Sequence, residues 1–135
     1  AKELGADVVP TPEILAIAAD IVSPNALGAI LTEQSIAALQ TKVIAGGANN
    51  QLATREDGAR VHARGILYAP DYVINAGGII NVCLEYLGQG DRSEVEARIH
   101  RIPDRLIEVW DESDRSGAPA SEVADMIAKR LIGRG

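Results

Sequence analysis

Three short runs of small and amide residues are the places where this chain could bind a ligand. They are residues 24–26 (Pro-Asn-Ala), 47–50 (Gly-Ala-Asn-Asn) and 75–78 (Asn-Ala-Gly-Gly). A neutral amide side chain both donates and accepts hydrogen bonds, so it suits a carboxamide or a carboxylate ligand without adding charge. Residues with little or no side chain also let a ligand lie against the backbone. The three runs therefore predict a polar ligand site, and plain structural turns are the alternative.

Each run follows a stretch with the composition of a buried strand, at residues 20–22, 42–45 and 72–74. We expect the strand at residues 72–74 to be central, with Asn75 capping the helix that follows it. The carboxyl ends of parallel strands lie along one edge of a sheet, where ligands bind. Three turns of this composition are less expected to arise by coincidence than a single one, so the pattern favours a ligand site over plain structural turns.

Other parts of the chain predict alternating strands and helices. Two further strands are expected at residues 7–9 and 66–68. Helices are expected after Thr11, after Thr32, over residues 55–65, over residues 76–87, over residues 91–116 with a break near Pro103, and after Pro119. The first is expected to bury Ile14, Leu15 and Ala18, and the last to bury Val123, Ile127 and Leu131. The helix at residues 76–87 is apolar on most sides and is therefore expected to be buried. This order predicts an α/β fold, with a three-layer parallel sheet and a C-terminal helical tail.

Composition excludes several classes of function. The 135 residues carry a formal net charge of −6, which argues against nucleic acid and against an anionic membrane surface as partners. Cys83 is the single cysteine, so no internal disulfide forms, as fits a cytoplasmic protein. No signal peptide is visible. Residues 1–5 resemble the end of a helix with Gly5 at its C-cap, so we expect the chain to be part of a longer protein.

The remaining reactive side chains do not form a recognisable site. His62 and His100 lack a third ligand at a suitable spacing, so no metal site is expected. Cys83, in an apolar helix, is expected to fill the core rather than act as a nucleophile. No G-x-G-x-x-G loop follows a strand, so no pyrophosphate cradle is visible. The residues alone therefore indicate the C-terminal half of a nucleotide-type α/β domain.

Three motifs carry a resemblance to a known family. Residues 43–52 (VIAGGANNQL), residues 64–78 (RGILYAPDYVINAGG) and residues 20–28, with the pattern Asp-x-x-x-Pro-x-Ala-x-Gly, resemble the amino-acid dehydrogenases that act on leucine, valine and phenylalanine. The resemblance runs from Asp20 to Leu87 and continues more loosely through the helical tail.

The resemblance implies an NAD-dependent oxidative deamination of an apolar L-amino acid to its 2-oxo acid and ammonia. The chain would be the second half of a Rossmann-type sheet, as a partial dinucleotide-binding domain with an α/β core at residues 1–90 and helices at residues 91–135. Its partners would be the amino-acid substrate and an N-terminal substrate domain, in a homo-oligomer. The family's catalytic Lys and Asp and its Gly-rich loop would lie outside this chain, which is therefore expected to contain no catalytic residue and to be inactive alone.

The resemblance also implies roles for individual residues. Asn49 and Asn75 would lie near both the nicotinamide and the substrate. Ile79 and Val82 would line the pocket for the substrate side chain, and as branched aliphatics they favour leucine or valine over phenylalanine. The backbone at Pro24, Ala26 and Ala48 would lie beside the cofactor.

The chain departs from the family pattern at two positions. Asn25 stands where these enzymes commonly carry Cys, and Pro103 interrupts a helix that is usually continuous. Neither departure removes a catalytic group. A non-catalytic α/β binding or assembly module that retains the fold is the alternative function. The resemblance also implies that the strand at residues 7–9 lies beyond two central strands missing from this chain, which leaves an open apolar edge and predicts self-association.

Overall fold

A parallel sheet of three two-residue strands organises the fold. In the computed structural model, which describes residues 2–133, the strands β1 (Ile21–Val22), β2 (Val43–Ile44) and β3 (Leu67–Tyr68) lie in the order β1-β2-β3. Val43 of β2 is in register with Ile21 and Leu67, on either side of it. Backbone bonds continue both ladders beyond the strands: Ala45 donates to Val22 and Ala69 donates to Ile44. The carboxyl ends of the three strands therefore meet at one edge.

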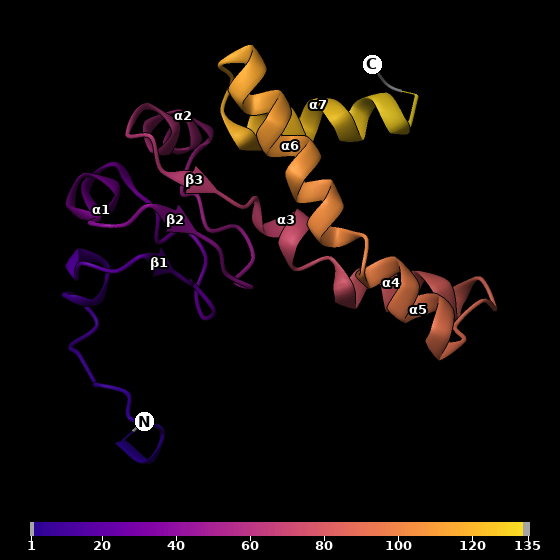
Figure 1. Ribbon diagram of the computed structural model, residues 1–135, viewed down its shortest axis with the longest axis horizontal. Helices are drawn as coiled ribbons and strands as arrows, with labels where there is room; N and C mark the ends of the chain where they lie inside the picture. The colour runs from indigo at the N-terminus through magenta and orange to yellow at the C-terminus, as the bar shows by residue number, and fades with distance from the viewer. Residues whose placement is uncertain (1, 134–135) are drawn as a thin grey trace.

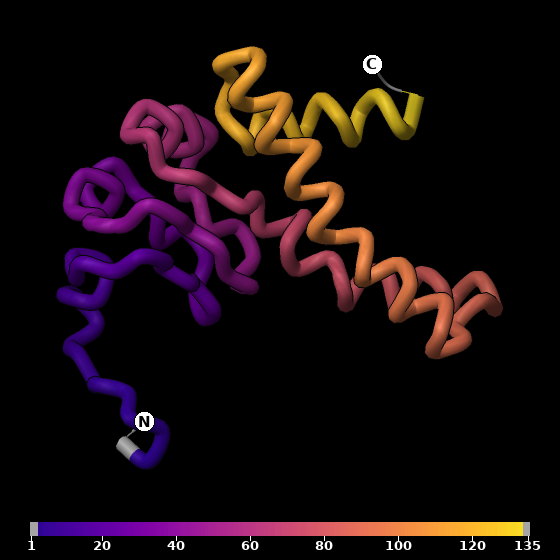
Figure 2. Tube along the Cα trace, in the orientation of Figure 1, coloured from indigo at the N-terminus to yellow at the C-terminus, as the bar shows by residue number. Residues whose placement is uncertain are grey.

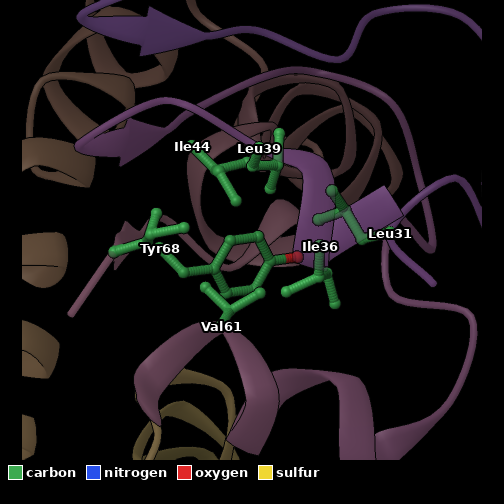
Figure 3. Packing of buried hydrophobic residues seen from close by; sticks show 7 residues of the cluster. Leu31, Ile36, Leu39, Ile44, Val61 and Tyr68 are labelled. Carbon is green, nitrogen blue, oxygen red and sulfur yellow. The ribbon is translucent and has the colours of Figure 1, made fainter. Parts of the chain in front are cut away.

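Two crossover helices cover the sheet, α1 (Glu33–Ala38) after β1 and α2 (Arg55–Ala63) after β2 (Figure 1). α1 begins with a capping box, in which Thr32 Oγ1 accepts the Ser35 N–H and Ser35 Oγ accepts the Thr32 N–H. The main core lies between these helices and the sheet, where the Tyr68 ring lies among Ile44, Val61 and Ile36 (Figure 3). This core holds the strand ends in place.

The C-terminal half adds a second layer of helices. α6 (Ile102–Ser116) and α7 (Ala120–Leu131) pack together around Val109, Val123 and Ile127, and α7 also contacts α2 and β3. α3 (Asp71–Ile74) leads from the sheet to α4 (Gly77–Tyr86), which pairs with α5 (Arg92–Ile99). The α4–α5 pair projects away from the sheet (Figure 2).

Much of the expected element order is confirmed. The strands expected at residues 20–22, 42–45 and 66–68 are β1, β2 and β3, and they form a parallel sheet in an α/β fold. The expected break in the long helix is the step from α5 to α6, with Pro103 in the first turn of α6, where its missing N–H costs nothing. Gly117, with φ of +70°, ends α6, and Pro119 precedes α7.

The strand expected at residues 72–74 is wrong, because those residues form α3. β3 ends at Tyr68, and the Tyr72 hydroxyl bonds to Asp125 Oδ1 (2.8 Å) in α7, while Val73 packs against the α6–α7 cluster. These tertiary contacts outweigh the strand preference of aromatic and β-branched residues. Asn75 does not cap α4, since Ala76 holds the cap position and the Asn75 side chain bonds elsewhere.

The expectations for the N-terminal segment and for α4 also need correction. Residues 7–9 form no strand, and the helix expected after Thr11 is a single 3-10 turn, Ile14–Ala16, with Ile14 exposed, Ala18 exposed and only Leu15 half-buried. No strand among residues 2–133 lies beside residues 7–9 to pair with them. A further 3-10 turn, Lys2–Leu4, precedes Gly5, whose φ of +68° fits the expected cap.

α4 is exposed rather than buried, because within residues 2–133 its main contact is with a single helix, α5. Leu84 is its one buried residue, and Ile79, Val82 and Cys83 are all exposed, so Cys83 does not fill a core. Leu131 at the end of α7 is likewise exposed, in contrast to Val123 and Ile127 on the same helix.

Candidate functional site

The three predicted polar runs meet at the carboxyl edge of the sheet, where two asparagine side chains hold one residue, Gly47. The Gly47 N–H donates to Asn25 Oδ1 (2.8 Å), and the Gly47 carbonyl accepts from Asn75 Nδ2 (3.2 Å). Asn75 Nδ2 also donates to Asn49 Oδ1 (2.5 Å). The loop after β2 is therefore joined to the loop after β1 on one side and to the segment after β3 on the other.

The orientation of these amides follows from the backbone groups that they contact. A carbonyl oxygen only accepts hydrogen bonds, so Asn75 must turn its Nδ2 towards the Gly47 carbonyl. Because this nitrogen only donates, Asn49 must turn its Oδ1, and not its Nδ2, towards Asn75. Asn49 Nδ2 and Asn75 Oδ1 then have no hydrogen-bond partner within residues 2–133. The pair thus offers one donor and one acceptor, which is the complement of a carboxamide.

Close backbone packing supports the loop beneath this pair. The Ala48 N–H donates to the Pro24 carbonyl (2.9 Å), and both residues are buried. A Cβ on Gly46 would lie 2.1 Å from that same carbonyl oxygen, so only glycine fits there. Pro24 and Ala48 therefore bind each other through their backbones and brace the site from below.

The other predicted site residues lie further out. Ala26 is exposed and borders a hollow of about 710 Å³, which is lined mainly by apolar residues around β1 (among them Ile14, Ile17, Ile21 and Val22). Ile79 and Val82 lie on α4, with 62% and 58% of their surface exposed, so the described residues do not close a pocket around them. The fold thus brings two pairs of predicted residues into direct contact, Asn49 with Asn75 through their side chains and Pro24 with Ala48 through their backbones.

Two buried residues that hydrogen-bond to the loop after β2 were not among the predicted site residues. Asp71, at the start of α3, is 7% exposed, and its Oδ2 accepts the Asn50 N–H (2.6 Å) while its Oδ1 accepts the Tyr68 hydroxyl (3.1 Å). Gln51 is fully buried and donates to the Gly46 and Ala48 carbonyls (2.7 and 3.0 Å). For Asp71 the signal was a single acidic residue after Pro70, a pattern equally typical of a turn, and Gln51 follows two asparagines with no separate signal of its own.

Electrostatics at this edge depend on Asp71. Burial, followed by the negative charge of Asp71, raises the pKa of the Tyr68 hydroxyl well above its usual value. Tyr68 therefore keeps its proton and donates to Asp71. No Lys, Arg or His within residues 2–133 forms an ion pair with Asp71.

Two other kinds of site were sought in the described part of the chain. Residues 2–133 contain no group of three or more His, Cys, Asp or Glu side chains placed to hold a metal ion. None of the helices within that range is both long enough and apolar enough to cross a bilayer.

Fold and site together define an α/β protein with a candidate ligand edge at the carboxyl ends of parallel strands. Comparison with known proteins assigns the family. Residues 1–131 match the family described as Glutamate/Leucine/Phenylalanine/Valine dehydrogenase. The chain belongs to this family, as the resemblance predicted.

Individual relatives agree with this assignment. Leucine dehydrogenase from Thermoactinomyces intermedius is 42% identical over 131 residues, covering 97% of this chain and 36% of the relative. L-tryptophan dehydrogenase from Nostoc punctiforme is 44% identical over 134 residues, covering 98% of this chain and 38% of the relative. A crystal structure of L-tryptophan dehydrogenase from the same organism superposes with a TM-score of 0.91 at 39% identity, over 98% of this chain and 39% of that one. The chain thus spans less than two-fifths of the length of these relatives.

Proposed function

We propose that this chain provides the cofactor edge, and part of the substrate pocket, of an NAD-dependent dehydrogenase of apolar L-amino acids. In this proposal the chain is the second half of a Rossmann-type domain, with the α/β core at residues 1–90 and the helices at residues 91–135. Family membership and the parallel order β1-β2-β3 support that assignment. An N-terminal substrate domain and a homo-oligomer complete the proposed enzyme.

The Asn49–Asn75 pair is the observation that carries the proposal. Its unpartnered Nδ2 donor and Oδ1 acceptor match the two groups of the nicotinamide carboxamide. The pair is neutral, so it orients the ring without opposing the positive charge of the oxidised cofactor. NAD, when bound, supplies the hydride acceptor for the substrate α-carbon.

Other residues of this chain have supporting roles in the proposal. Pro24 and Ala48 hold the backbone on which the cofactor lies, and Ala26 borders the same edge. Gly47, held by Asn25 and Asn75, keeps the two amide-bearing loops at a fixed separation. The groups that move protons lie outside this chain in the proposal, so the isolated chain is inactive.

The substrate is proposed to be aliphatic, with Ile79 and Val82 lining its side-chain pocket. Both side chains project from α4 less than two turns after Asn75, and both are free to be covered by another domain and by substrate. The names of the relatives include both leucine and tryptophan dehydrogenases, so pocket size is the property to measure. One methylene changes selectivity by about 1–3 kcal/mol.

The test uses the longest natural polypeptide that contains this chain. NADH formation is followed by absorbance with leucine, valine, phenylalanine, tryptophan and glutamate as alternative substrates. Turnover that is fastest with leucine or valine is the expected result. A folded polypeptide that neither turns over any of these amino acids nor binds NADH contradicts the proposal and favours a non-catalytic module.

A pair of asparagine variants ties the activity to the site. Asn75→Asp replaces the Nδ2 donor with an acceptor that faces the Gly47 carbonyl, so kcat/KM for NAD is expected to fall by about 10²-fold. Asn81→Ala is the matched control, because Asn81 is an exposed asparagine of α4 outside the amide cluster. Equal losses in both variants would refute the role given to Asn75.

A further inference from the structure

The buried carboxylate of Asp71 has no part in the proposed ligand contacts, yet it lies beside them. It is 7% exposed and has no ion pair within residues 2–133. A buried charge without a counter-ion is costly unless hydrogen bonds stabilise it. Its two bonds, from the Asn50 N–H and the Tyr68 hydroxyl, are therefore the structural reason for its position.

The Asn50 N–H belongs to the same planar peptide as the Asn49 carbonyl. When Asp71 Oδ2 holds this N–H at 2.6 Å, it therefore also fixes the backbone that carries the Asn49 side chain. Asn50 has a φ of +53°, in the left-handed region that asparagine adopts more readily than most non-glycine residues. The Asn50 carbonyl provides a second anchor, since it accepts the Ala29 N–H at 2.6 Å.

Tyr68 connects this carboxylate to the core. Its ring is 4% exposed in the cluster between the sheet and the crossover helices, and its backbone carbonyl accepts Trp110 Nε1 (2.8 Å). Because the ring is packed in the core, its hydroxyl holds Asp71 Oδ1 in place. Asp71 Oδ2, the other carboxylate oxygen, then faces the Asn50 N–H. A chain of contacts thus runs from the core through Asp71 to the peptide before Asn50.

We propose that Asp71 is a positioning residue for the carboxamide site: through the Asn50 N–H it holds Asn49 in register with Asn75. This inference rests on the proposed function, since it concerns the same site. Asp71 acts by geometry and not by charge. Asn at position 71 would therefore suffice, with Oδ1 accepting the Asn50 N–H and Nδ2 donating to the Tyr68 hydroxyl.

Three variants of the longest natural polypeptide test the geometric role. Asp71→Ala is expected to lower kcat/KM for NAD by about 10- to 100-fold. Asp71→Asn is expected to stay within about threefold of the parent, since it keeps both contacts. Asp57→Ala is the matched control, because Asp57 is also buried and also accepts one backbone N–H and one hydroxyl (both from Thr54, 2.9 Å) but does not bond to Asn50, and it should stay within about threefold.

A double-mutant cycle with Asn49→Ala separates positioning from general destabilisation. If Asp71 acts through Asn49, Asp71→Ala should cost less than about threefold once Asn49→Ala is present. Multiplicative losses, or an Asp71→Asn variant as impaired as Asp71→Ala, overturn the inference while the proposed function stands. A parent polypeptide that neither turns over nor binds NADH overturns both.

Discussion

Substitution of Gly46 by alanine tests the packing beneath the candidate site. A Cβ at this position would meet three Pro24 atoms, at 2.1 Å (O), 2.4 Å (N) and 2.6 Å (Cδ). Two of these atoms are backbone, so the loops must separate by more than about 1 Å to reach van der Waals contact. Such a separation breaks the Ala48–Pro24 bond (2.9 Å) and strains the Gly47–Asn25 bond (2.8 Å).

The expected cost follows from these contacts. Overpacking of this kind costs about 1–3 kcal/mol, and each lost hydrogen bond costs about 1 kcal/mol. Gly46→Ala should therefore lower the free energy of unfolding by about 2–4 kcal/mol. NADH should also bind more weakly, because Gly47, which both Asn25 and Asn75 bind, is displaced.

Urea denaturation and NADH fluorescence titration of the longest natural polypeptide measure the two effects. Gly78→Ala is the matched control for stability: Gly78 lies in the first turn of α4, and a Cβ there would meet nothing within 4 Å. Helix propensity predicts a gain of about 0.5–1 kcal/mol for that variant. The packing argument fails if Gly46→Ala unfolds within about 0.5 kcal/mol of the parent.

Three further predictions concern pH, selectivity and association. Burial raises the pKa of Tyr68, so above about pH 10 the folded chain keeps a proton that the unfolded chain loses. The free energy of unfolding should therefore fall as the pH rises above about 10. In urea titrations at several pH values, Tyr68→Phe should make this fall less steep. Replacing Ile79 and Val82 by alanine should lower the ratio of kcat/KM for leucine to kcat/KM for phenylalanine by about 10- to 200-fold, without a change in circular dichroism. An unchanged ratio would exclude both residues from the substrate pocket. The 135-residue chain by itself should self-associate in sedimentation velocity, because Ile21 and Leu27 leave apolar surface exposed beside β1, and a monodisperse, cooperatively unfolding monomer would contradict this.

Local chemistry explains what could be predicted from the sequence. Short apolar strands at residues 20–22, 42–45 and 66–68, the Thr32 cap, the Pro103 break and the Gly117 stop are all set by neighbouring residues, and each is confirmed. The meeting of the polar runs at one edge was predicted from the parallel strands, although Asn75 reaches Asn49 from the end of α3 and not from the end of a strand. The motifs that resemble the dehydrogenases lie at this same edge.

Only the tertiary structure decided the features that depend on distant contacts. Residues 72–74 have strand composition, but a partner on α7 makes them helical, and α4 is apolar yet exposed because the described residues do not cover its outer face. Asp71 resembles a turn residue in the sequence, and only its bonds to Tyr68 and Asn50 identify it as a support of the site. The sequence by itself thus determined most of the element order and the meeting of the polar runs at one edge of the sheet, since both follow from periodicity and turn chemistry. The hydrogen-bond partners were decided by packing, because they join residues that the chain brings together only when it folds.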